Sequence, residues 1–123
     1  DITNFTHGLD WVNAMQPKTF NWDSRSWYTG EDATSQDILD AVPDGTKKKV
    51  DLQLGFLAQD ILAIEQASGY ADNNANSLLV DITEDNTRYG LRYDRIAPIL
   101  VNAIKELSAK NEALLTRIEA LES

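Results

Sequence analysis

The strongest pattern of apolar and polar positions in this chain lies at its C-terminal end, over residues 94–123. Leucine and isoleucine recur there at spacings of three and four, which is typical of a long helix with one apolar stripe. Asp94 is its expected N-cap, because a short carboxylate accepts from the free N–H groups of a first turn. In heptad terms, the a positions are Ala97, Ile104, Asn111 and Ile118, and the d positions are Leu100, Leu107, Leu114 and Leu121.

This stripe predicts that the helix packs against other helices. An apolar stripe left in water is an aggregation liability, so it either folds back on the chain's own core or meets other chains. Three features favour self-association in a parallel coiled coil. The heptads are sustained, Asn111 at an a position fixes register at a cost in stability, and Arg117 at g can reach Glu122 at the next e of a neighbour. Ile at a with Leu at d favours two strands, whereas Leu115 at e argues for more, so these rules leave dimer and trimer open.

The first 93 residues show shorter patterns, typical of a small α+β fold. One helix is expected to end at Met15, with Thr6 as its N-cap, and another over residues 57–67, with Ser68 and Gly69 as its stop. Four strands are expected, over residues 18–22, 50–56, 78–83 and 88–93. A hairpin connection over residues 84–87 is expected to join the last two. We therefore expect a globular part over residues 1–93 and a helical part over residues 94–123.

Residues 23–46 interrupt the globular part with a polar, acidic segment, which we call the arm. An insert of this length in a small domain is usually functional or disordered. Ile38, Leu39 and Val42 support a helical turn or two within it. The arm is either a mobile surface loop or a protrusion that touches a partner. In the second case Trp27 and Tyr28 are its expected anchors, because large aromatic side chains supply contact area at low entropic cost.

Composition excludes several classes of function. The net charge of −9 argues against nucleic acid or an anionic membrane as partner, and no apolar run approaches the length of a membrane span. With no cysteine and a single histidine, His7, we expect no metal site and no cofactor. Residues 72–76 carry oxygen ligands but lack the far bidentate Glu of a calcium loop. The lysines at 47–49 are expected to form a solvated run, with nucleotide binding as the minor alternative. The chain opens without a secretory signal, and Asp1 in place of Met suggests a processed or trimmed chain.

Three segments together resemble one protein family. Residues 8–22 are similar to its opening helix, proline and strand, and residues 91–107 to its strand-to-helix end. Its most recognisable short motif, a Gly-Phe-Ile-Ala-Gln-Glu-Val type of run, is matched here by Gly55, Phe56, Ala58 and Gln59 within residues 55–61. The family is the intramolecular chaperone auto-processing domain found at the C-termini of bacteriophage tail fibres, tailspikes and neck appendages.

The resemblance implies a homotrimer that helps the fibre domain upstream in its own precursor to fold and register. It thereby favours a trimer over a dimer. It also implies release by self-cleavage, with a Ser nucleophile activated by a Lys whose pKa burial lowers. That Ser and Lys are expected upstream of Asp1, so no catalytic residue is assigned in this chain and its standing as an enzyme stays open. The implied location is the host cell cytoplasm during virus assembly, outside the mature virion. The alternative is a permanently attached oligomerisation module that is never cut.

Overall fold

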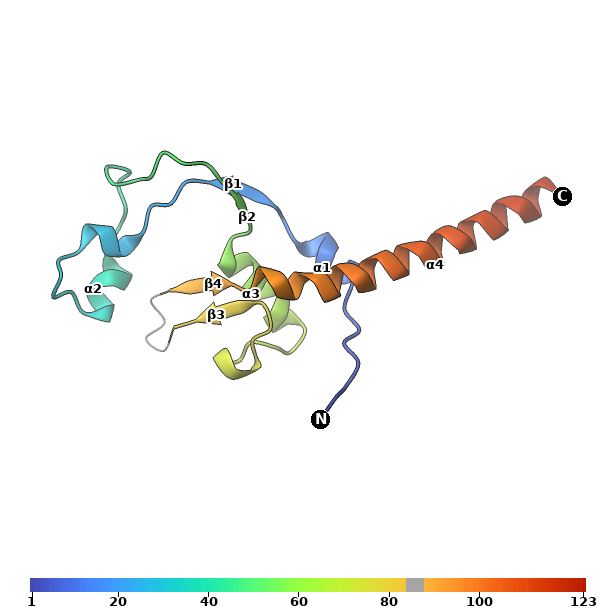
Figure 1. Ribbon diagram of the computed structural model, residues 1–123, viewed down its shortest axis with the longest axis horizontal. Coiled ribbons are helices and arrows are strands. Elements are labelled where there is room, and N and C mark those ends of the chain that lie inside the picture. Colours follow the sequence, from blue (N-terminus) through green and yellow to red (C-terminus); the bar gives the residue numbers. More distant parts are fainter. Residues whose placement is uncertain (84–87) are drawn as a thin grey trace. The chain divides into compact units, whose positions relative to one another are not determined.

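The computed structural model describes residues 1–83 and 88–123 (Figure 1), so the expected hairpin connection at 84–87 lies outside the described residues. The expectation of a mixed fold of helices and small sheets with a long C-terminal helix is confirmed. The chain divides into two compact units. We call residues 1–15 with residues 92–123 the helical unit, and residues 16–91 the mixed unit. The first 15 residues thus group with the long helix rather than with the sheets.

The helical unit contains α1 (Leu9–Ala14), a 3-10 turn η3 (Tyr93–Arg95) and α4 (Ile96–Glu122). Helix α4 has 27 residues, a length of about 40 Å at 1.5 Å per residue. The first turn of α4 tolerates Pro98, because a missing N–H there has no intrahelical partner to lose.

Both expected N-caps in the helical unit are wrong. Asp94 lies inside η3, and its side chain does not cap α4. The chain enters α4 through a 3-10 turn whose backbone bonds already satisfy the Arg95 and Ile96 N–H groups, which leaves no role for a capping side chain there. Thr6 lies two residues before Gly8, which is the N-cap of α1. A glycine occupies this cap because residue 8 lies directly against the backbone of α4, as described below.

The mixed unit contains two separate two-stranded antiparallel sheets. Strand β1 (Lys18–Phe20) pairs with β2 (Gln53–Gly55), with Thr19 opposite Leu54. Strand β3 (Val80–Ile82) pairs with β4 (Tyr89–Leu91), with Asp81 opposite Gly90. All four expected strands are present, each shorter than its alternating pattern suggested.

Helix α3 (Ala58–Ala67) packs beside β3 and β4, and its buried Ile61 contributes to the core with Leu79 and Val80. The expected stop is confirmed. Gly69 has φ of +87°, the Tyr70 N–H donates to the Glu65 carbonyl, and the Gly69 N–H donates to the Gln66 carbonyl. This pair of bonds is a Schellman motif, which needs a residue in the left-handed region, so glycine is the suitable choice at position 69.

The arm leaves β1 and returns to β2, carrying a 3-10 turn η1 (Arg25–Tyr28) and the helix α2 (Ser35–Asp40) (Figure 1). The expected helical turns are therefore present. Thr34 caps α2 in a capping box, in which its side chain accepts from the Asp37 N–H and the Asp37 carboxylate accepts from the Thr34 N–H. Hydrogen bonds close the base of the arm: the Lys49 N–H donates to the Trp22 carbonyl, and the Asn21 amide donates to the Val50 and Asp51 carbonyls.

Candidate interaction surfaces

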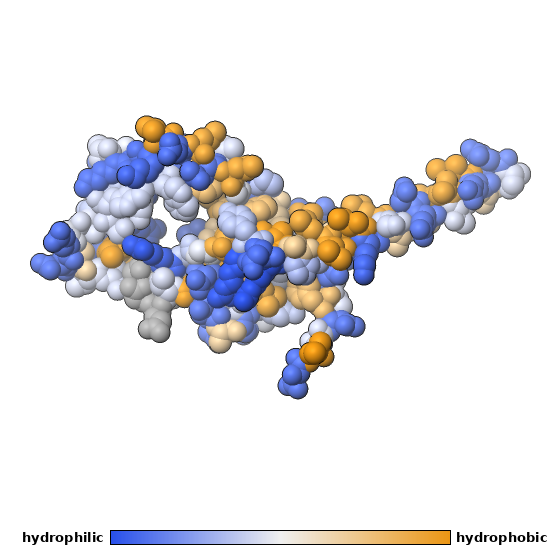
Figure 2. Space-filling model, viewed as in Figure 1, coloured by the Kyte–Doolittle hydropathy of each residue, from blue (hydrophilic) through white to orange (hydrophobic). Residues whose placement is uncertain are grey.

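The heptad stripe of α4 stays exposed in the single chain. Leu100 is 44% exposed, Ile104 65% and Leu114 55%. Orange apolar side chains run along α4 between blue polar ones in Figure 2. Every a and d residue expected to form a coiled coil is exposed, as are the two expected to pair between chains: Ala97, Leu100, Ile104, Leu107, Asn111, Leu114, Ile118 and Leu121, with Arg117 and Glu122.

A different stripe of α4 makes the contacts within the chain. Ile99 and Ala103 are buried, and Asn102 and Glu106 are half-buried, at spacings of three and four residues that define one helix face. These four residues fall at the c, f and g positions of the heptad. Packing of the N-terminal segment against α4 therefore leaves the a and d stripe, together with Leu115 at e, free for a partner.

Residues 5–9 are fastened to this second face of α4. The Asn102 side-chain amide donates to the carbonyls of Phe5 and His7, each at 3.0 Å between nitrogen and oxygen. The Glu106 carboxylate accepts from the Leu9 N–H at 3.1 Å. We call these residues, 5–9 with Asn102 and Glu106, the N-terminal clamp. Because one side chain donates and the other accepts, the clamp fixes the axial position (the height) of residues 5–9 along α4.

Gly8 is the point of closest approach in the N-terminal clamp. A Cβ atom at this position would lie 2.6 Å from the Glu106 Oε1 atom, 2.8 Å from the Ala103 nitrogen and 2.9 Å from the Asn102 carbonyl carbon. Two of these atoms belong to the α4 backbone and cannot move aside. Only glycine allows the segment to lie this close to the helix.

An aromatic cluster covers the N-terminal clamp. The buried Trp11 ring stacks on His7 at 4.9 Å between ring centroids and meets Phe5 edge-on at 5.3 Å. His7 Nδ1 donates to the Asp10 carboxylate at 2.6 Å, and the Gly8 N–H donates to its other oxygen at 3.0 Å. The hydrogen bond from His7 holds the pKa of Asp10 below its ordinary 3.8, and the hydrogen bond from the Gly8 N–H lowers this pKa by a smaller amount. His7 thus has a structural role in this cluster.

The expected anchors of the arm are largely used in contacts with the lysines that directly follow the arm. Lys49 lies over the Trp27 ring, with its Nζ 5.0 Å from the centroid, and Lys47 lies 5.6 Å from the centroid of Tyr28. The Tyr28 hydroxyl donates to Asp23 and accepts from the Lys47 N–H, and Lys47 Nζ donates to the Trp27 carbonyl. Two of the three lysines at 47–49, expected to be merely solvated, therefore brace the aromatic rings. Trp27 and Tyr28 are both half-buried.

Three strongly exposed apolar side chains lie on the return of the arm to β2. Val50 is 92% exposed, Leu52 68% and Leu54 77%, all within five residues. We call these three residues the outer patch, and orange side chains gather along this edge in Figure 2. Sequence reasoning read them as one face of a strand. In the structure Leu54 lies opposite Thr19 of β1, and both residues are exposed.

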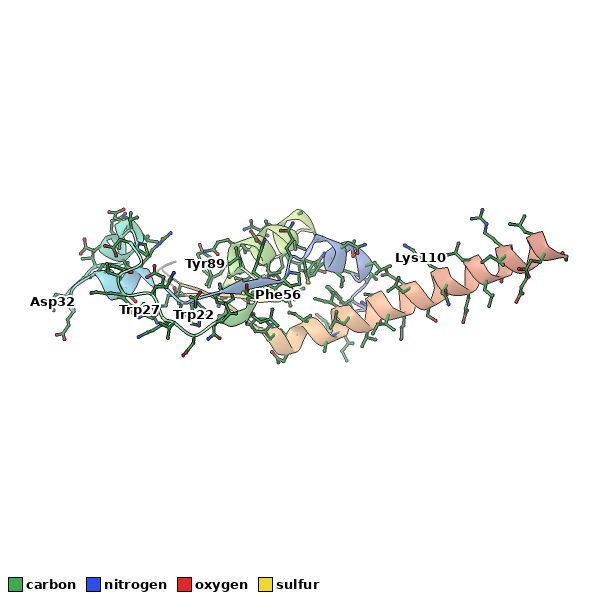
Figure 3. All side chains as sticks on the ribbon, turned by 90° about the horizontal axis from the view of Figure 1, so that it is seen from above. Trp22, Trp27, Asp32, Phe56, Tyr89 and Lys110 are labelled. Atoms are coloured by element: carbon green, nitrogen blue, oxygen red, sulfur yellow. The ribbon has the colours of Figure 1, made fainter. Side chains whose placement is uncertain are left out.

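A hollow of about 880 Å³ lies within the mixed unit, between the arm and the β3–β4 hairpin. Its wall includes Trp22 and Trp27 from the arm side and Tyr89 from β4, three of the side chains labelled in Figure 3. Gln59, at the start of α3, also lines it. Trp27 therefore borders this hollow on one side while Lys49 covers its ring.

The matched motif lies at the junction of β2 and α3. Gly55 is the buried last residue of β2, paired with Lys18, and Ala58 is the first residue of α3. Phe56 is half-buried and Gln59 is exposed. These positions connect the ribbon at the base of the arm to the core helix, so the motif joins the two parts of the mixed unit.

Glu65 is a buried residue that sequence reasoning missed. It is fully buried on α3, and its carboxylate accepts from the backbone N–H groups of Leu78, Leu79 and Val80 at 2.6, 3.1 and 3.1 Å. The Ser77 hydroxyl lies 3.2 Å from the same carboxylate. Three backbone N–H donors thus converge on one buried carboxyl group, which ties α3 to the start of β3. The available signal was an acidic residue four positions after Ile61, on the buried face of the helix.

The asparagine side chains of residues 72–76 use their amide oxygens on backbone N–H groups of this loop and of β3. Asn73 Oδ1 accepts from the N–H groups of Ala75 and Asn76, and Asn74 Oδ1 accepts from the Ile82 N–H. The loop forms a 3-10 turn, η2 (Asn74–Asn76), and these side chains organise it. Within residues 1–83 and 88–123, no group of three or more acidic or histidine side chains gathers where it can hold a metal ion. In the same ranges, no helix is long and apolar enough to cross a membrane.

Comparison with known proteins identifies the family. A family model described as chaperone of endosialidase matches residues 1–70. This match spans more than half of the chain, so the protein belongs to the chaperone of endosialidase family. The resemblance to the intramolecular chaperone domain of tail fibres is thereby confirmed, and a chaperone role is supported. Neither the curated proteins nor the solved structures contain a match to this chain.

Proposed function

We propose that this protein is a homotrimeric intramolecular chaperone that assists the folding and registration of a viral fibre domain preceding it in one precursor. The observation that carries this proposal is the exposed heptad stripe of α4, in a chain whose family is a chaperone family. Parallel helices joined through this stripe hold three copies of the upstream chain close together. That raises the effective concentration of the fibre segments for one another.

A trimer is favoured over a dimer by the width of the apolar face. Leu115 at an e position is 53% exposed, beside Leu114 at 55% and Ile118 at 50%. A face that extends past a and d suits more than two helices. Arg117 and Glu122 are exposed at g and e, where neighbouring parallel helices pair opposite charges.

The outer patch and the arm are the proposed contacts with the fibre domain. Val50, Leu52 and Leu54 present apolar side chains to water, which is typical of a surface that meets a partner. Trp27 and Tyr28 take a bracing role in this proposal: they stiffen the arm through Lys47 and Lys49 and so hold its apolar edge in place.

Release of the chaperone is proposed to follow self-cleavage by a Ser–Lys pair located before Asp1. No residue of this chain is assigned to that reaction. Before release the protein acts in the host cell cytoplasm during assembly, and after release it does not stay in the mature virion. It needs no cofactor and no metal, and its partners are its own copies and the fibre domain.

The test uses the precursor that contains the residues before Asp1. The proposal expects a Ser followed closely by a Lys in that stretch, and a trimeric precursor that yields two fragments on purification. Replacement of that Ser by Ala should leave one uncut, trimeric chain. Absence of the Ser and Lys, or cleavage that survives the replacement, would refute the autoproteolytic part and favour a permanently attached oligomerisation module.

A further inference from the structure

The N-terminal clamp points to a role beyond local packing. It joins two segments almost a hundred residues apart in sequence, since Asn102 contacts Phe5 and His7 across separations of 97 and 95 residues. One segment is the start of the chain, and the other is the first part of the helix that carries the heptad stripe. An assembly that fixes the position of α4 along its axis therefore also fixes the position of residues 5–9 along that axis.

We infer that the N-terminal clamp is a register device that transmits the alignment of the α4 helices to the chain preceding residue 5. This inference rests on the proposed trimer. In parallel helices joined through a and d, equivalent residues lie at equal heights along the common axis. Clamps built from Asn102 and Glu106 then place the three copies of Phe5 at equal heights too, so three fibre chains begin folding in register.

The chemistry of the clamp suits fixed axial placement better than simple adhesion. The Asn102 amide has two N–H bonds, and two carbonyls of the segment receive them. Glu106 can only accept when ionised, and it accepts from the Leu9 N–H. A shift of the segment by one residue along α4 would bring His7 or Leu9 to the position of Gly8. The α4 backbone leaves no room there for a Cβ atom.

The clamp also leaves the heptad stripe untouched, as a register device requires. Asn102 and Glu106 occupy f and c positions, away from Leu100, Ile104 and Leu107 at d and a. The residues that set the height and the residues that join the chains can therefore be changed separately. That separation makes the inference testable in the chain as it is.

The experiment measures distances between chains in the assembled protein. The chain has no cysteine, so Asn4→Cys provides a single spin-label site one residue before the clamp, at an exposed position. Pulsed electron spin resonance should give one narrow distance between chains in the trimer. Asn102→Asp faces the Phe5 and His7 carbonyls with carboxylate oxygens, and Gly8→Ala displaces the segment from α4. Each should broaden the distance while sedimentation still reports a trimer.

Two control variants accompany the label. Glu106→Gln keeps an acceptor for the Leu9 N–H and should retain the narrow distance. Asn13→Asp makes the same chemical change as Asn102→Asp at an exposed position and should also retain it. Hydrogen exchange at the Leu9 N–H reads the clamp directly. Loss of the two Asn102 bonds should speed it by roughly 10- to 100-fold, at about 0.5–1.5 kcal/mol for each bond.

The outcomes separate the inference from the proposed function. A trimer whose label distance is narrow in the parent chain and broad in Asn102→Asp and Gly8→Ala supports the register role. A trimer with equally narrow distances in those variants, or with a broad distance in the parent chain, overturns it and leaves the proposed trimer intact. A monomeric parent chain refutes the proposed trimer and the register role together, even where Leu9 exchange shows that the clamp is closed.

Discussion

Removal of the Glu65 carboxylate should strongly destabilise the mixed unit. In Glu65→Ala, the backbone N–H groups of Leu78, Leu79 and Val80 lose their acceptor, and Leu79 and Val80 are fully buried. A buried donor left without a partner costs about 1–3 kcal/mol. Partial relaxation around three such groups leaves an expected loss of about 3–5 kcal/mol, a large share of the roughly 5–15 kcal/mol that stabilises a typical domain.

Glu65→Gln should cost less, for a reason that the geometry specifies. One oxygen of the carboxylate accepts from Leu78 and Leu79, and the other accepts from Val80. A glutamine amide retains one oxygen and presents an NH₂ group to the remaining donor. One backbone N–H is then unsatisfied, so the expected loss is about 1–3 kcal/mol.

The assay is urea unfolding followed by far-UV circular dichroism, with free energies from the linear extrapolation. Hydrogen exchange at the Leu79 and Val80 N–H groups assigns the loss to β3. Glu31→Ala, at an exposed position on the arm, is the matched control and should stay within about 0.5 kcal/mol of the parent chain. If Glu65→Ala also stays within about 0.5 kcal/mol, the carboxylate does not hold β3 to α3 and the reasoning is refuted.

Leu114→Asp should convert the assembly to monomers, because it places a charge at a d position of every helix. Thr116→Asp is the control, since it adds the same charge at an f position, away from the stripe. Sedimentation velocity should show an unchanged mass for this control. Asp10 should stabilise the helical unit above its ordinary pKa of 3.8, and this contribution should be lost as pH falls through its lowered folded-state pKa. Asp10→Asn should therefore flatten the acid limb of a stability–pH curve measured by urea unfolding, and an unchanged acid limb would contradict the bond from His7.

The features predicted well from sequence depend on local patterns. The heptad stripe of α4, the end of α3 at Gly69 and the helical turns of α2 all follow from spacings within one or two turns. Each is dictated by side chains that act on their own element, so periodicity and the glycine stop were sufficient. The strand positions followed from alternation, although pairing with a single partner shortened each strand to three residues.

The features that were missed depend on contacts distant in sequence. Glu65 acts on residues 13 to 15 positions later, and the Asn102 amide acts on the chain's first residues. The expected cap at Thr6 failed for the same reason, since the close approach of α4 decides where α1 begins. Trp27 looked like a free anchor because no local pattern shows that Lys49 folds back over its ring. Such pairings follow from topology rather than from periodicity.

The central claim is that α4 joins three chains through its exposed heptad stripe. Sedimentation equilibrium of the unlabelled chain across a dilution series tests it most directly. We predict one species with three times the mass of the chain, stable on dilution, and conversion to the chain mass in Leu114→Asp. A persistent dimer or a monomer at all concentrations would contradict it.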